Sequence, residues 1–222
     1  MKYSNNDFIF KEKNGGLEFI GDFNSLYKNL DDPWYQSCQT EEPIKYYYKF
    51  SRDRLITQLK NINPKTVLEV GCGLGYVTEN IQSSLNCDVL GMDVSEVAIS
   101  RAIDNFPNLI FKQGDIKSEN FIVEKKFDLV ILSQLLWYVL DSISNVFENC
   151  FSLLKSNGKV VITQAFLISE QIYGADICDG FDGLIDYLNR EDINNMFQIE
   201  YENYDDSNFY VHNDGLIILR MV

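Results

Sequence analysis

The sequence predicts an α/β fold, a doubly wound sheet of seven mostly parallel strands, and two observations carry that prediction. From residue 66 onward, short runs rich in β-branched residues alternate with runs of helical periodicity, as a parallel sheet covered by helices on both faces requires. The first of these strands enters a glycine-rich turn and then a helix, in the stretch VLEVGCGLGYVTENI (67–81). The chain of 222 residues is 45% hydrophobic, which suffices for one core.

The strands are expected where apolar and β-branched residues gather between turn residues. They are Thr66 to Val70, Asp88 to Met92, Leu109 to Lys112, Phe127 to Leu132, Lys159 to Thr163, Gln198 to Tyr204 and Leu216 to Met221. Helices are expected between them over Tyr76 to Leu85, Ser95 to Phe106 and Ile143 to Lys155. The last of these helices is expected to end at NGK, where Gly158 suits a left-handed turn.

Two segments lie outside this alternation. Residues 1–62 are predicted to form a cap on a domain of residues 63–222. Within the cap, FIFKEKNGGLEFIG (8–21) is typical of a hairpin about an Asn-Gly-Gly turn, and a helix is expected from about Ile44 to Ile62. The other segment, 167–189, is too irregular to assign and longer than ordinary connections, which favours a functional insertion.

Composition excludes several function classes. A net charge of -14 repels phosphate backbones, so no nucleic-acid partner is expected. The five cysteines are scattered without CxxC spacing, which favours free thiols over disulfides or a zinc site. No signal peptide and no long apolar span are found, so a cytoplasmic protein without a membrane partner is expected. With 14% aromatic residues, a strongly aromatic binding cleft is compatible with the sequence.

The glycine turn departs from the dinucleotide fingerprint G-x-G-x-x-G. Its glycines are Gly71, Gly73 and Gly75, so the pattern is G-x-G-x-G, and Glu69 stands two residues before it. This arrangement resembles the first motif of the class I S-adenosylmethionine-dependent methyltransferases. The resemblance implies a Rossmann-like fold with an antiparallel last strand, and S-adenosyl-L-methionine as cofactor. The glycines would let the backbone approach the amino-acid arm of the cofactor, and Glu69 would orient its ammonium group; alternatively, the glycines only make a tight turn.

Further cofactor contacts are implied by later motifs of the same family. Asp93, with Met92 before it, ends the second strand 22 residues after Gly71, where its carboxylate would accept both ribose hydroxyls. Alternatively, Asp93 caps the next helix. Ser95 can fill that capping role equally well, which leaves Asp93 free for the ribose.

The adenine and the fourth strand complete the cofactor set. In FKQGDIKS (111–118), Asp115 would accept from the adenine amine and Ile116 would pack on its ring, although a surface turn looks the same. Ser133 and Gln134 lie at the carboxyl end of the fourth strand, where ligands of open α/β sheets bind. No metal is expected, because Ser133 stands where metal-dependent catechol enzymes of the family are expected to carry an aspartate.

The acceptor is narrowed by exclusion. None of the four prolines forms the Asn/Asp-Pro-Pro-Tyr/Phe or Pro-Cys motif of base-modifying relatives. The segments DDPWYQS, KYYYKF and LSQLLWYVLD resemble the nodulation protein S group of sugar N-methyltransferases. This resemblance implies methyl transfer to an O or N atom of a small polar metabolite: a saccharide, a sugar nucleotide or an amine.

Candidate catalytic residues follow from side-chain type. His212, the single histidine, is the obvious base for a hydroxyl acceptor, although a lone histidine is more often a surface or packing residue. Tyr138 and Asp141 are further candidates, with Tyr138 also a candidate core residue. Aromatic faces for the sulfonium are expected from Tyr46, Tyr47, Trp137 and Tyr138, and alternative bases from Asp176, Asp179 and Asp182.

Two other function classes stay open. A methyltransferase-like scaffold would bind cofactor, or nothing, and act through a partner. A nicotinamide-dependent oxidoreductase is disfavoured by the displaced third glycine. A homodimer is also left open.

Overall fold

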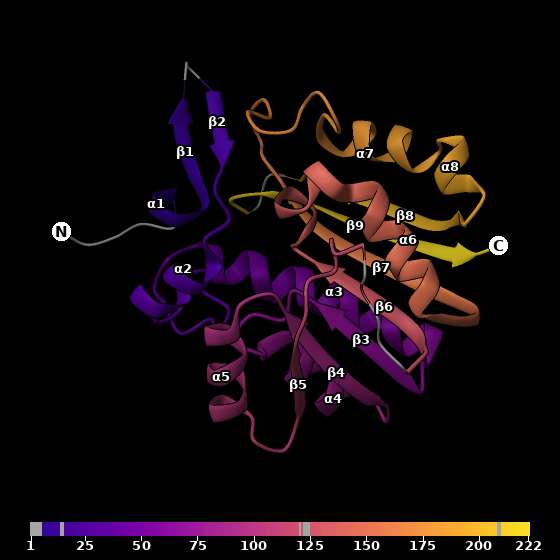
Figure 1. The fold of residues 1–222 in the computed structure, drawn as a ribbon, viewed down its shortest axis with the longest axis horizontal. Coiled ribbons are helices and arrows are strands. Elements are labelled where there is room, and N and C mark those ends of the chain that lie inside the picture. Colours follow the sequence, from indigo (N-terminus) through magenta and orange to yellow (C-terminus); the bar gives the residue numbers. More distant parts are fainter. Residues whose placement is uncertain (1–5, 14–15, 120, 122–124, 208–209) are drawn as a thin grey trace.

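A computed structural model of the chain describes residues 6–13, 16–119, 121, 125–207 and 210–222. Its main feature is a seven-stranded sheet in the order β5-β4-β3-β6-β7-β9-β8 (Figure 1). Strands β3 to β7 run parallel, and β9 pairs antiparallel with both β7 and β8. The predicted doubly wound sheet with an antiparallel last strand is therefore confirmed.

The strands of the sheet follow the predicted ranges closely, because each carries the apolar run that predicted it. They are β3 (Thr66–Val70), β4 (Asp88–Asp93), β5 (Ile110–Gln113), β6 (Phe127–Ser133), β7 (Leu154–Phe166), β8 (Phe197–Asp205) and β9 (Asn213–Met221). The connecting helices are α4 (Tyr76–Ser84), α5 (Glu96–Asn105) and α6 (Ile143–Leu153).

The predicted end of the helix from Ile143 was wrong. The helix stops at Leu153, and Leu154 already pairs with Phe127 in the sheet, where its side chain is buried. The left-handed residue is Asn157, with φ of 63°, and Gly158 lies within β7. A pairing partner 27 residues away in sequence thus overrides the local helix-ending signal.

Helices cover both faces of the sheet. Neighbouring residues of one strand enter different cores: Leu68 of β3 packs with Val146 and Phe147 of α6, whereas Val67 packs on the other face. That second core includes Leu55 of α3 (Ile44–Ile62), a helix whose bounds match the prediction. Later elements are α7 (Gly180–Leu188) and α8 (Glu191–Asn194), the former lying inside the unassigned insertion.

The amino-terminal elements lie against the glycine turn and α5. They are α1 (Asn6–Ile9), the hairpin strands β1 (Phe10–Lys13) and β2 (Gly16–Phe19), and α2 (Phe23–Asn29). The hairpin forms as predicted, although its expected first strand is helical up to Ile9, and turn residues 14–15 lie outside the described residues. Arg101 of α5 donates to the carbonyls of Tyr27 (2.8 Å) and Leu30 (2.9 Å). The division into a cap and a second domain stays a prediction.

Within the described residues, no helix combines the length and apolar character needed to cross a bilayer.

Candidate functional site

A cavity of about 660 Å³ lies at the carboxyl ends of the parallel strands. Its wall includes the ends of β3, β4 and β6, the turn after β5, and parts of α3 and the hairpin. After β3 the chain builds β4 and β5 on one side and then returns to place β6 on the other, so β3 and β6 flank a topological switch point (Figure 1). Open α/β sheets bind ligands at such points.

Most of the residues singled out in the sequence meet at this cavity. Those that line it are Glu69, Gly71, Asp93, Asp115, Ile116, Ser133, Gln134, Tyr138 and His212. Those that do not are Gly73, Gly75, Met92 and Asp141.

The glycine turn is hydrogen-bonded to the backbone of β4. The amides of Gly71 and Cys72 donate to the carbonyl of Met92, at 2.7 and 2.9 Å, so Met92 acts through its backbone while its side chain is buried. Gly71 has φ of 76°, in the left-handed region that favours glycine, and lines the cavity without a side chain.

The other two glycines do not line the cavity, and each is closely packed, so their expected contact with the cofactor stays a prediction. A Cβ on Gly73 would lie 2.6 Å from the side chains of Gln36 and Tyr27, so the cap presses directly on the turn. Gly75 begins α4 with φ of 85°, and a Cβ there would lie 2.7 Å from the Phe111 ring.

Asp93 is more engaged than the sequence indicated. Ser95 does cap α5 by accepting from the amide of Ala98, but Asp93 also accepts from the amides of Gly73 (2.9 Å) and Ser95 (2.8 Å). A carboxylate offers about four lone-pair sites, so two remain for a ligand in the cavity. Burial raises the pKa of Asp93, and the amides oppose that rise.

Glu69 and Arg52 both line the cavity, and the charge of Arg52 acts on the carboxyl group of Glu69. Burial raises the pKa of Glu69 from 4.5 to about 7, while the Thr78 hydroxyl, which donates to it, and the nearby charge of Arg52 lower it. Arg52 of α3 donates to the carbonyl of Gln36 at 2.6 Å, yet its Nε has no hydrogen-bond partner and it forms no ion pair among the described residues. No motif in the sequence marked Arg52 as a site residue.

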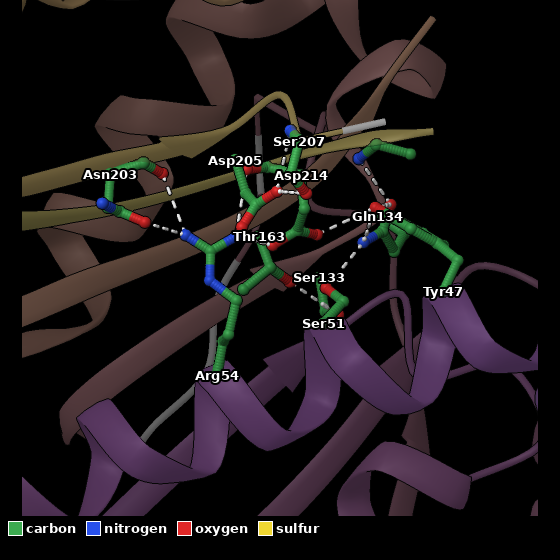
Figure 2. A network of polar contacts seen from close by, with 11 residues as sticks. Tyr47, Ser51, Arg54, Ser133, Gln134, Thr163, Asn203, Asp205, Ser207 and Asp214 are labelled. Carbon is green, nitrogen blue, oxygen red and sulfur yellow. Dashed lines mark hydrogen bonds and ion pairs between the residues drawn. The ribbon is translucent and has the colours of Figure 1, made fainter. Parts of the chain in front are cut away.

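A polar network ties α3 to the far half of the sheet (Figure 2). Gln134 follows β6 with φ of 57°, and its side chain bridges two elements. Its Oε1 accepts from the amide of Ala165 at 2.7 Å, and its Nε2 donates to the hydroxyls of Tyr47 (3.1 Å) and Ser51 (3.3 Å). These bonds hold a backbone conformation that is uncommon for a non-glycine residue.

The same network reaches β9. The Tyr47 hydroxyl donates to Asp214 at 2.9 Å, and Arg54 pairs with the same carboxylate and with Asn203 (Figure 2). Asp214 lies two residues beyond His212, so this network positions the segment that carries the histidine.

His212 lines the cavity with its ring edge-to-face against Tyr47, at 5.4 Å between centroids. Its Nδ1 is buried and has no hydrogen-bond partner among the described residues. Burial lowers its pKa, so the ring is neutral at pH 7.

The other catalytic candidates fare differently. Asp141 is not among the residues that line the cavity and pairs with Lys117 at 3.4 Å, so its role as a base stays a prediction without support from this geometry. Tyr138 lines the cavity, but burial raises its pKa above the usual range and disfavours a base role. Trp137 lines the cavity, whereas Tyr46, Tyr47, Asp176, Asp179 and Asp182 do not.

Six aromatic rings form one wall of the cavity, here called the aromatic wall: Phe10, Phe19, Phe23, Trp34, Tyr138 and Tyr173. Tyr138 lies 5.4 Å from Trp34 and 5.6 Å from Phe23, measured between ring centroids. Phe10 of the hairpin lies 4.9 Å from Tyr173, in the insertion after β7. Among the described residues, no group of His, Cys, Asp and Glu side chains comes together to hold a metal ion.

Comparison with known proteins places this geometry in a family. Residues 67–158, which contain β3 to β6 and the glycine turn, match the sequence profile of a methyltransferase domain. This segment of the chain is therefore a methyltransferase domain. Its fold is shared by the N-methyltransferase NodS of Bradyrhizobium japonicum in complex with S-adenosyl-l-homocysteine, with a TM-score of 0.63 and 20% identity over 89% of this chain and 96% of NodS. The predicted family is thus confirmed, and a NodS structure is among its structural neighbours.

Curated relatives match only in part. A ubiquinone biosynthesis O-methyltransferase of Haemophilus ducreyi is 25% identical over 147 residues, which are 63% of this chain and 61% of the relative. A protein of Invertebrate iridescent virus 6 that bears the name of a proposed methyltransferase is 30% identical over 123 residues, 55% of this chain and 45% of the viral protein. The match thus spans about half the length of these relatives.

Proposed function

We propose that this methyltransferase domain makes the chain an S-adenosylmethionine-dependent enzyme that methylates an O or N atom of a small molecule. The observation that carries the proposal is the meeting of Glu69, Gly71 and Asp93 at one cavity on the carboxyl edge of the sheet. The sequence singled out Glu69 and Gly71 for the amino-acid arm of the cofactor and Asp93 for its ribose.

The charges at the cavity fit the amino-acid end of that cofactor. Arg52 offers a guanidinium without a carboxylate partner among the described residues, and Glu69 offers a carboxyl group at the same cavity. A zwitterion needs one group of each sign, and Gly71 leaves the backbone open between them. When bound, the cofactor would supply an electrophilic methyl group, and the chain would hold it and exclude water.

The remaining cofactor contacts are proposed from their placement. Asp93 would accept the ribose hydroxyls through its two remaining lone-pair sites, and Asp115 and Ile116 would hold the adenine. Ser133 and Gln134 would close the side nearest the acceptor.

The sequence narrows the acceptor to a saccharide, sugar nucleotide or amine, without a nucleic-acid partner, in a cytoplasmic protein. These finer statements stay predictions.

Isothermal titration with S-adenosylhomocysteine tests the proposal. We expect micromolar binding, and Asp93→Asn should weaken it by about 2 kcal/mol, roughly 30-fold in Kd, because a buried hydroxyl pair loses a charged acceptor. Asp88→Asn is the matched control, since Asp88 lies at the opposite, exposed end of the same strand. No binding to the unmodified protein would overturn the proposal, and an unaffected Asp93→Asn would remove Asp93 from the site.

A further inference from the structure

Once the cofactor is placed, the described residues that line the cavity leave no carboxylate for the acceptor. Of the described residues that line the whole cavity, three are acidic, Glu69, Asp93 and Asp115, and the proposed function assigns all three to the cofactor. This distribution contrasts with the net charge of -14 of the chain. A cationic amine acceptor would therefore lack an opposite charge.

The glutamine side chains and the Ser133 hydroxyl of the cavity already have hydrogen-bond partners within the protein. The four glutamines of the cavity each accept a backbone N–H through the side-chain oxygen, at 2.7 to 3.0 Å: Gln36 from Leu74, Gln134 from Ala165, Gln164 from Leu136 and Gln171 from Gly180. The Ser133 hydroxyl accepts from Thr163 at 3.0 Å. A bound sugar would bury several hydroxyl groups next to side chains that already form hydrogen bonds within the protein. Buried hydroxyl groups without a hydrogen-bond partner weaken binding.

What the cavity does offer is aromatic and apolar surface. The aromatic wall brings rings from the hairpin, the segment after α2, the turn after β6 and the insertion together, with centroids 4.9 to 6.4 Å apart. A flat ring packs against such faces in offset or edge-to-face geometry. At the mouth, the lining residues Ile20, Leu167 and Ile172 are 47%, 46% and 66% exposed, so the apolar surface continues outward.

His212 is a titratable side chain of the cavity wall, and its buried Nδ1 has no hydrogen-bond partner among the described residues. Since its Nδ1 is shielded from solvent, the ring would accept a proton through Nε2. A phenolic hydroxyl has a pKa of about 10, against roughly 16 for a water-like hydroxyl, so a neutral imidazole removes the phenolic proton far more readily.

From these observations we propose that the acceptor is a phenol-type aromatic hydroxyl compound with an apolar substituent, packed on the aromatic wall and deprotonated by His212. This inference rests on the proposed function. The acceptor hydroxyl gives its proton to Nε2 of His212, and its oxygen forms a bond to the methyl carbon. The bond from that carbon to sulfur breaks with its electron pair left on sulfur. The products are an aryl methyl ether and S-adenosylhomocysteine, and the imidazolium returns its proton to solvent.

Binding tests the acceptor class separately from the cofactor. Protein saturated with S-adenosylhomocysteine is titrated with 4-propylphenol, methyl glucoside and propylamine, by calorimetry and by quenching of Trp34 and Trp137, the two tryptophans of the chain, which both line the cavity. We expect 4-propylphenol to bind at least tenfold more tightly than the other two. Equal or tighter binding of the glucoside or the amine, or no binding of the phenol, overturns the inference; absent S-adenosylhomocysteine binding overturns the proposed function instead.

Substitutions test the two parts of the inference, the packing of the acceptor on the aromatic wall and its deprotonation by His212. Tyr173→Ala should weaken 4-propylphenol at least fivefold, with Tyr46→Ala, outside the cavity, as control; Tyr173→Leu replaces it if the alanine variant does not fold. His212→Gln should keep phenol binding within twofold while methyl transfer falls at least a hundredfold. Because a phenol ionises without help at high pH, that deficit should shrink between pH 7 and pH 9.5. Unaffected binding in the Tyr173 variants, or a pH-independent deficit, contradicts the inference.

Discussion

The hydroxyl of Tyr47 donates a hydrogen bond of 2.9 Å to Asp214, although the two residues are 167 positions apart in the chain. Tyr47 belongs to α3 and Asp214 to β9, so this bond joins the helix over the cavity to the last strand of the sheet. Burial raises the pKa of Asp214, and the donors Tyr47 and Arg54 oppose that rise. The bond therefore stabilises a buried charge next to the segment that carries His212.

Tyr47→Phe removes this donor and leaves the ring in place. We expect the free energy of unfolding to fall by about 2 kcal/mol, because a hydrogen bond to a buried charged group is lost. Thermal unfolding should show a lower Tm, by roughly 4 to 8 °C for a chain of this size. Tyr46→Phe, one residue earlier and 57% exposed, should change neither quantity. Equal Tm values for the two variants would contradict this role of Tyr47.

The glycine turn allows a prediction that separates folding from binding. Gly75→Ala forces a side chain into the left-handed region and against Phe111, so the unfolding free energy should fall by about 1 to 2 kcal/mol or more. Since Gly75 does not line the cavity, the Kd for S-adenosylhomocysteine should stay within threefold. Gly71→Ala, whose methyl group would stand at the cavity wall, should weaken binding at least tenfold. Calorimetry on both variants decides, and a similar loss in each would support a cofactor role for Gly75.

The parts of the fold that sequence predicts well are those with a strong local pattern. The helix Ile44–Ile62 and the strand Thr66–Val70 match their predicted bounds, because periodicity and turn residues mark both ends. The helix from Ile143 was extended too far because the pairing of Leu154 with Phe127 is non-local.

The residues of the candidate site likewise divide into those that a local sequence pattern marks and those that only tertiary packing brings together. Glu69 and Asp93 were found because a motif marks them, whereas Arg52 lies in a helix without any motif and reaches the cavity only through the packing of α3. The aromatic wall likewise joins Phe10 to Tyr173, and no short-range pattern relates residues so far apart. Motifs thus marked Glu69 and Asp93, whereas tertiary packing brings Arg52 and the aromatic wall to the same cavity.

The raised pKa of Glu69 predicts that the free energy of unfolding depends on pH. Its pKa is raised to about 7 in the folded protein, so the folded state binds the proton more tightly than the unfolded chain does. The unfolding free energy therefore falls as pH rises from about 4.5 to about 7, by about 3 kcal/mol from this group. Asp93 and Asp214, whose pKa values are also raised, act in the same direction.

Glu69→Gln isolates that contribution, because the amide keeps the shape and an oxygen for the Thr78 hydroxyl. We expect the variant to match the unmodified protein at pH 5 and to be the more stable of the two at pH 8, measured by urea unfolding without ligand. Glu202→Gln, at an exposed position, is the control and should follow the unmodified protein at both pH values. A constant difference between Glu69→Gln and the unmodified protein would show that Glu69 does not titrate in this range.

Replacing Arg52 should weaken the binding of ligands that carry the amino-acid end of the cofactor and spare ligands that lack it. Arg52 lines the same cavity as Glu69 and its guanidinium has no carboxylate partner among the described residues, so a ligand carboxylate is its natural counter-charge. Arg52→Met should therefore weaken S-adenosylhomocysteine at least tenfold, by about 1.4 kcal/mol or more. Methylthioadenosine, which keeps the nucleoside but lacks the amino-acid end, should bind the variant and the unmodified protein equally. Arg54→Met serves as the control on the same helix, because Arg54 pairs with Asp214 outside the cavity and its loss should lower Tm without this selectivity. Equal weakening of both ligands by Arg52→Met would place Arg52 in the structural support of α3 and leave the carboxylate of the cofactor without an assigned partner.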